Sequence, residues 1–239
     1  MMKLLAVLSV LMVVAGSISA GPNLHIQNSD FDFGMVGTGM TVYHRTWLKA
    51  TSDSAVTINA VKTGCFCLVA PLPDSTIPAG DSIPLDLTWR VQPAEETVSR
   101  TVLVFPNTDS EPLRISLTAQ PIVHTDTLPF EVPWQGLRFG GQDEEQIDRA
   151  FMMANLSDSS MTVTVISAPD ERYQLELPES VPAQNHENCR ITLKTDQFDG
   201  PYEGSFTVEL TGDWPVPRRL TIPIVVGDFS YRAPVTTLQ

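Results

Sequence analysis

The feature that most constrains this chain is a series of short stretches in which every second residue is apolar. In residues 84–89, Leu85, Leu87 and Trp89 alternate with Pro84, Asp86 and Thr88. A period of two puts one set of side chains on each face of a β-strand. Similar β-rich runs occupy residues 41–48, 56–60, 101–105, 113–117, 147–154, 161–166, 189–195, 205–210 and 220–226. Turn-forming residues interrupt these runs about every 8 to 12 residues, which predicts an all-β sandwich fold.

A second feature is an internal duplication. Phe31-Asp32-Phe33-Gly34 recurs as Leu137-Arg138-Phe139-Gly140, and Ser52-Asp53-Ser54 recurs as Ser157-Asp158-Ser159. The offset is about 105 residues, which is the size of one sandwich domain. The duplication predicts two tandem immunoglobulin-like (Ig-like) β-sandwich domains, residues 23–121 and 122–228, followed by a C-terminal tail, residues 229–239.

The N-terminus has the composition of a signal peptide. Lys3 is followed by an apolar stretch, residues 4–15, and then by small residues up to Ala20. This order predicts a signal peptide, residues 1–20, that is cleaved after Ala20. No second apolar stretch of comparable length follows, so we expect a periplasmic or extracellular protein with no membrane span after signal removal.

The net charge of the chain limits the classes of partner that we expect it to bind. The formal net charge is −13, and cleavage would remove one lysine and no acidic residue, which leaves −13 − 1 = −14. Nucleic acids and anionic lipids attract cationic surfaces, so neither is an expected partner. We expect another envelope or surface protein. Trp134 and Trp214 stand beside prolines in predicted loops and are candidate partner contacts, whereas Trp47 and Trp89 are expected in the core.

The chemistry of the chain is concentrated at Cys65 and Cys67. In a strand these two side chains would lie on one face and Phe66 would point into the core. The thiols could be packed or joined in a disulfide, or they could bind copper or zinc or act in redox chemistry. A bond across one intervening residue would close a small strained ring of the kind that tends to be reducible. The third cysteine, Cys189, is expected to be a buried apolar residue.

The motifs of the first half carry a family resemblance. The Phe31-Asp32-Phe33-Gly34 motif, an alternating strand, the Cys-x-Cys pair and then Ile77-Pro78-Ala79-Gly80-Asp81 resemble the bacterial DUF1573 domain. That domain is similar to the Ig-like modules of the ASH and major-sperm-protein group. This chain has Cys65-Phe66-Cys67-Leu68 where that family usually has Cys-Gly-Cys-Thr, and its second half has Asp170-Glu171-Arg172 at this place. The resemblance implies an exported Ig-like module of undefined function.

No recognisable catalytic motif is present in the sequence. His25, His44, His124 and His186 show no metal-ligand spacing to one another or to the cysteine pair. We therefore expect no enzyme and no cofactor, and we predict a non-catalytic binding or scaffolding protein that presents loops or a free sheet edge to its partner. The alternative is a thiol-based metal (Cu/Zn) or redox carrier that acts through Cys65 and Cys67.

Overall fold

The strands of the N-terminal half, residues 23–122, form two facing sheets. The computed structural model describes residues 23–107, 111–122, 125, 127–140, 147–168, 171–194 and 201–227, so the predicted signal peptide and the tail at 229–239 lie outside the described residues. One sheet contains, in spatial order, β1 (Leu24–Gln27), β3 (Thr41–Ala50), β7 (Ser82–Arg90) and β5 (Leu68–Val69). The facing strands are, in order, β2 (Asp30–Gly37), β9 (Leu113–Ile122), β8 (Val98–Pro106), β4 (Val56–Thr63) and β6 (Thr76–Ile77).

The C-terminal half, residues 127–227, arranges its strands in the corresponding order. One sheet contains β10 (Phe130–Glu131), β12 (Asp148–Asn155), β16 (Asn185–Leu193) and β14 (Tyr173–Glu176). The facing strands are β11 (Leu137–Phe139), β18 (Arg218–Val226), β17 (Tyr202–Thr211), β13 (Met161–Ser167) and β15 (Ser180–Val181). Each strand of this half therefore has a counterpart at the same sheet position in the N-terminal half.

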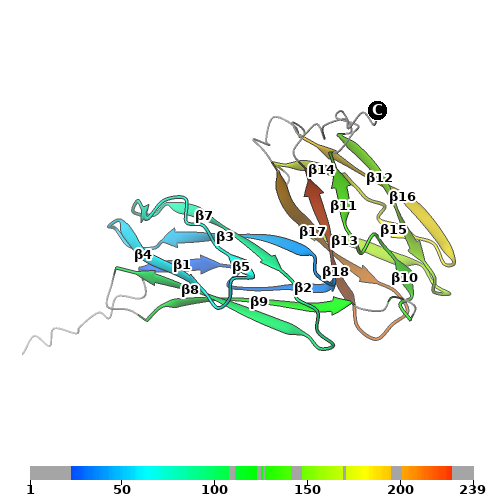
Figure 1. Ribbon diagram of the computed structural model, residues 1–239, viewed down its shortest axis with the longest axis horizontal. Helices are drawn as coiled ribbons and strands as arrows, with labels where there is room; N and C mark the ends of the chain where they lie inside the picture. The colour runs from blue at the N-terminus through cyan, green and yellow to red at the C-terminus, as the bar shows by residue number, and fades with distance from the viewer. Residues whose placement is uncertain are drawn as a thin grey trace, which may run out of the picture.

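Strand β2 joins the two halves. Its residues Met35 and Val36 pair in parallel with β9 on one side and with Leu220 and Thr221 of β18 on the other. The strands that include β2 and β18 thus form one ten-stranded sheet that runs through both halves. Figure 1 shows the two halves as separate bodies set at an angle, with β2 and β18 meeting between them.

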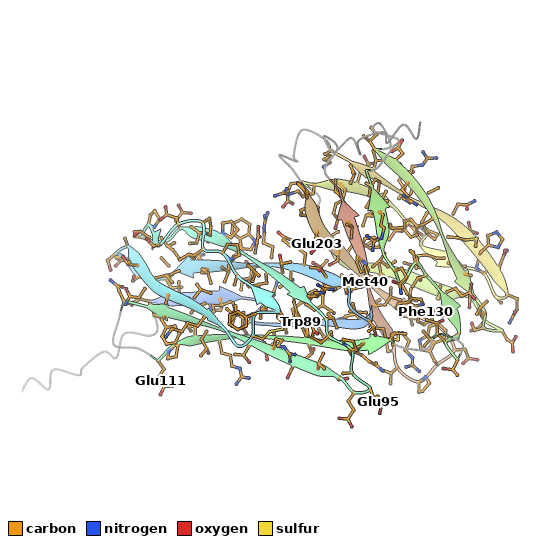
Figure 2. All side chains as sticks on the ribbon, viewed as in Figure 1. Met40, Trp89, Glu95, Glu111, Phe130 and Glu203 are labelled. Carbon is orange, nitrogen blue, oxygen red and sulfur yellow. A yellow bond between two sulfur atoms is a disulfide. The ribbon has the colours of Figure 1, made fainter. Side chains whose placement is uncertain are left out.

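Alternation along the strands fills two apolar cores. The first core contains Trp89 and residues from both sheets of the N-terminal half. The second contains Phe130 and residues from both sheets of the C-terminal half, and it also takes in Met35 from β2. Trp89 and Phe130 mark the two cores in Figure 2, and Met40 and Glu203 mark the region where the halves meet.

The predicted all-β class is confirmed, since every described element is a strand. None of the described segments forms a helix that is long and apolar enough to cross a membrane. Trp89 is buried, as expected, but the expectation that Trp47 packs in the core is wrong because this side chain is 40% exposed. In β3 the even-numbered residues from Val42 to Ala50 face the core, and Trp47 therefore lies on the outer face.

Candidate contact site at the disulfide loop

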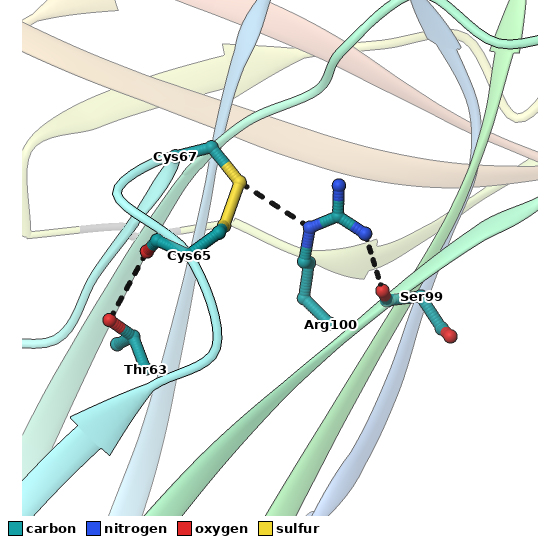
Figure 3. Close-up of a disulfide and its surroundings, with 5 residues drawn as sticks. All are labelled: Thr63, Cys65, Cys67, Ser99 and Arg100. Atoms are coloured by element: carbon teal, nitrogen blue, oxygen red, sulfur yellow. Dashed lines mark hydrogen bonds between the residues drawn. A yellow bond between two sulfur atoms is a disulfide. The ribbon is translucent and has the colours of Figure 1, made fainter.

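Cys65 and Cys67 form a disulfide in the turn between β4 and β5, which we call the disulfide loop (residues 64–67; Figure 3). The disulfide was one of the alternatives that the sequence left open. The expected strand at this position is wrong. Residues two apart in an extended strand are separated by about 6.6 Å, whereas the Cα atoms of this pair are 5.2 Å apart. The chain must therefore turn to bring the two sulfurs together.

The turn reverses the expected direction of Phe66. This side chain was predicted to point into the core, but it is 109% exposed, which is as open as a side chain in an isolated peptide. Val69, the second and last residue of β5, is 55% exposed. The loop therefore places two apolar side chains in solvent, and both of them line the same hollow.

Backbone and side-chain hydrogen bonds hold the disulfide loop in place. The Arg90 N–H donates to the carbonyl oxygen of Cys67 at 2.8 Å, which ties the loop to β7. The Leu68 N–H and the Thr63 hydroxyl both donate to the carbonyl oxygen of Cys65, each at 3.3 Å. These hydrogen bonds fix the backbone on both sides of Phe66.

The guanidinium of Arg100 lies against the disulfide. The Nε of Arg100, on β8, is 3.3 Å from Sγ of Cys67 (Figure 3). The same guanidinium donates to the carbonyl oxygen of Ser99 at 2.8 Å and lies over the ring of Trp89, 5.7 Å from its centroid. These contacts hold the positive charge beside one sulfur of the pair. The sequence could not reveal this contact because it depends on which residue of β8 faces the loop.

Two hollows flank the loop. One, of about 480 Å³, is lined by Cys65, Phe66 and the apolar side chains of Val61 and Leu68, among others. The second, of about 360 Å³, is lined by residues of both halves. Its lining includes Phe66, Cys67, Val69, Arg90, Arg138, Glu203 and Val225. The exposed apolar residues therefore border a recess that contains two arginines and one carboxylate.

With the disulfide formed, the two sulfurs of the loop cannot serve as metal ligands. The two sulfurs are bonded to each other and offer no thiolate ligand. Within the described ranges, no three His, Cys, Asp or Glu side chains are grouped closely enough to hold a metal ion.

The other predicted site residues lie away from the disulfide loop. Trp134 and Trp214 are partly buried and pack on the C-terminal core, each with its ring centroid about 6 Å from that of Phe130. Their role as partner contacts stays a prediction. Cys189 is free and buried, as expected, and burial raises the pKa of its thiol to about 11.

The corresponding loop of the C-terminal half contacts the N-terminal half. Glu171 forms an ion pair with Arg45 of β3, and Arg45 also binds Asp86 at 2.6 Å. Burial alone would raise the pKa of Asp86, but hydrogen bonds from Arg45 and Tyr43 outweigh it, so the pKa is lowered. The loop without cysteines thus contributes to the junction, and the disulfide loop remains exposed.

The sequence of the N-terminal half matches a known family. Residues 24–120 match the DUF1573 family model. That family is described as a protein of unknown function. The DUF1573 segment coincides with the N-terminal half and contains the disulfide loop, and the predicted resemblance is confirmed. A search of curated proteins finds no match to this sequence.

Three solved structures that are similar to this chain have low sequence identity to it. A protein of unknown function from Porphyromonas gingivalis is 13% identical, and the alignment covers 85% of this chain and 100% of that one, with a TM-score of 0.37. The ASH/PapD-like domain 7 of human CEP192 is 13% identical over 50% of this chain and 100% of that one, with a TM-score of 0.37. The YadV chaperone is 12% identical over 84% of this chain and 100% of that one, with a TM-score of 0.33.

Proposed function

We propose that this chain is an exported, non-catalytic Ig-like binding protein of the bacterial envelope. It contacts another envelope or surface protein through the disulfide loop. The observation that carries this proposal is Phe66, a fully exposed aromatic side chain on a turn closed by a disulfide. Burial of such a side chain at an interface contributes about 1.5–3 kcal/mol.

Export and domain organisation are parts of the same proposal. The signal-like composition of residues 1–20 supports export, and a disulfide is typical of oxidising compartments outside the cytosol. The matching strand order and the two apolar cores support two tandem Ig-like domains. These features favour a periplasmic or extracellular protein that displays a loop from a rigid sandwich.

The surface around Phe66 suits a partner segment of mixed chemistry. Phe66 and Val69 offer apolar area, and Arg90, Arg138 and Glu203 line the adjoining hollow. An aromatic anchor with a polar border is the usual arrangement of a binding hot spot. We therefore expect the partner to bring an apolar side chain to Phe66 and polar groups to the hollow.

Site-specific photocrosslinking in cells tests this proposal. A photoreactive phenylalanine at position 66 is expected to give one discrete crosslinked product with an envelope protein. The matched control places the same residue at Val216, which is 64% exposed in the other half of the chain. With the purified partner, Phe66→Ser should weaken binding at least tenfold while the free energy of unfolding changes by less than about 0.5 kcal/mol. Equal products at both positions, or none at position 66, would refute the proposed contact.

A second candidate function, a thiol-based metal or redox carrier, is favoured by the contact between Arg100 and Cys67. A cation beside a sulfur supports the thiolate that either chemistry requires. Metal analysis of reduced protein separates the carrier from the binding module. The carrier would hold stoichiometric copper or zinc, and both Cys65→Ser and Cys67→Ser would lose it.

A further inference from the structure

We propose that the Cys65–Cys67 bond is an exchangeable disulfide whose two sulfurs have different roles. An external dithiol attacks Cys65, and Cys67 leaves as a thiolate beside Arg100. Opening the bond releases the turn that presents Phe66, so the redox state of the loop controls the contact surface. This last step rests on the proposed function, whereas the difference between the sulfurs does not.

The leaving role of Cys67 follows from its neighbour. The Nε of Arg100 lies 3.3 Å from Sγ of Cys67. A nearby cation stabilises a thiolate, and a thiol that forms a thiolate readily is the faster leaving group in exchange. Arg100 needs little rearrangement to do this because Ser99 and the ring of Trp89 already hold its guanidinium.

The attacked role of Cys65 follows from its surroundings. Among the described residues, no hydrogen bond is made to its sulfur, and apolar side chains share the hollow of about 480 Å³ that it lines. A thiolate left on Cys65 would therefore be less stable than one on Cys67. The same hollow gives an incoming thiolate a route to Cys65.

The exchange is a balanced two-electron reaction. The thiolate of the external dithiol forms a bond to Sγ of Cys65, the Cys65–Cys67 bond breaks, and its electron pair stays on Sγ of Cys67. The second thiolate of the dithiol then attacks the mixed disulfide and displaces Cys65, which takes up a proton from solvent. The loop is reduced to a thiol at Cys65 and a thiolate at Cys67, and the dithiol is oxidised to its own disulfide.

Opening the bond is expected to change the loop without unfolding the sandwich. The hydrogen bonds from Gly64 N–H to Thr101 and from Arg90 N–H to Cys67 anchor the chain on either side of the turn. Phe66 makes no buried contact that would hold it once the ring is open, since it is fully exposed. Reduction should therefore disorder the presentation of Phe66, while β4 stays paired with β8 and β7 stays paired with β3.

Alkylation of single-cysteine proteins tests the difference between the sulfurs. In a Cys189→Ala background, Cys65→Ser leaves Cys67 and Cys67→Ser leaves Cys65. Iodoacetamide at pH 7, followed by mass spectrometry, should modify Cys67 about threefold faster than Cys65 or more. Arg100→Gln should abolish this advantage and leave the rate of Cys65 unchanged.

The control is Arg114→Gln, because Arg114 lies on the neighbouring strand and bonds Thr101. Equal rates, or an equal effect of Arg100→Gln on both thiols, would overturn the assignment.

Reduced glutathione tests the direction of attack in the intact disulfide. Limited treatment of the folded protein, acid quenching and peptide mapping should place most of the mixed disulfide on Cys65. An adduct mainly on Cys67, or no adduct while the protein is folded, would contradict the proposal.

The effect on presentation is tested with the photocrosslinking residue at position 66. A Cys65→Ser/Cys67→Ser protein should lose at least nine-tenths of the crosslinked product, and an unchanged yield would overturn the switch. If no partner is found at position 66, the proposed function fails while alkylation still decides the role of each sulfur. If crosslinking succeeds and the alkylation rates are equal, only the exchange assignment fails.

Discussion

At the scale of single residues, His44 is a buried imidazole inside the N-terminal core. Its ring stacks on Phe31 with the centroids 3.8 Å apart. Neither ring nitrogen has a hydrogen-bond partner among the described residues. Burial lowers the pKa of His44 to about 4, because the charged form would lose its hydration there.

This low pKa predicts that stability falls in mild acid. Above pH 6.5 the imidazole is neutral in both folded and unfolded chains, so its titration has no effect. Between pH 6.5 and about 4 the unfolded chain takes up the proton and the folded chain does not. The free energy of unfolding should therefore fall by about 3 kcal/mol across this interval from His44 alone. Urea unfolding at a series of pH values measures the loss.

His44→Leu should remove most of this pH dependence, since leucine is apolar and similar in size. His186→Gln is the control because His186 is exposed, and its curve should follow that of the unchanged protein. The same slope in His44→Leu and the unchanged protein would show that other groups cause the acid sensitivity.

At the scale of elements, Gly34 allows β2 to pass close to β18. Its φ is +63°, and a Cβ at this position would lie 2.1 Å from the carbonyl oxygen of Arg219. The equivalent Gly140 also has a positive φ, +85°. The repeated Phe-Gly motif thus marks a backbone conformation that other residues adopt only with strain.

Gly34→Ala should therefore destabilise the protein strongly, by about 3 kcal/mol or more, because it combines an unfavourable φ with a backbone clash. Gly80→Ala separates the two causes. Gly80 has a φ of +74° but no atom within 4 Å of an added Cβ, so only the conformational cost of about 1 kcal/mol applies. If urea unfolding shows equal losses of stability in Gly34→Ala and Gly80→Ala, the close approach of β2 to β18 at Gly34 is not the cause.

The strands that the sequence predicted best are those with long alternation. Residues 84–89 and 101–105 lie within β7 and β8 as expected. Two-residue strands such as β5 and β6 were not predicted, since a pair of residues shows no period. The sequence predicted a strand at the disulfide loop because the alternation of apolar residues continues through Cys65 and Cys67. Only the bond between the two cysteines reveals the turn.

At the scale of the whole molecule, the junction joins the halves by more than a linker. Met35 of β2 belongs to the C-terminal core. The hydroxyl of Ser205, on β17, accepts from the backbone N–H of Tyr43 at 2.9 Å and donates to its carbonyl oxygen at 3.3 Å. Thr221 donates its hydroxyl to the carbonyl oxygen of Phe33 at 2.7 Å. The sequence could not predict the pairing of β2 with β18, because that pairing depends on contacts distant in sequence.

The shared sheet predicts that both halves unfold together. Two single-tryptophan proteins, one with Trp89 and one with Trp214, report on the N-terminal and C-terminal cores respectively. Their fluorescence midpoints in urea should coincide, because unfolding of either half removes one of the two paired strands, β2 or β18, and exposes the edge of the other. Gly34→Ala in both proteins should separate the midpoints. Different midpoints without that substitution would show that the halves are energetically independent.

The pairing of β2 with β18 also sets an order of events during synthesis. Of the described strands, β2 is among the first to leave the ribosome and β18 is the last. Until the final strand arrives, β2 has an unpaired edge and Met35 has no core to enter, and such a nascent chain is open to aggregation. A chaperone that holds the growing polypeptide would be needed most at that stage. A chain that terminates before residue 218 would lack β18 and could not form the pairing with β2.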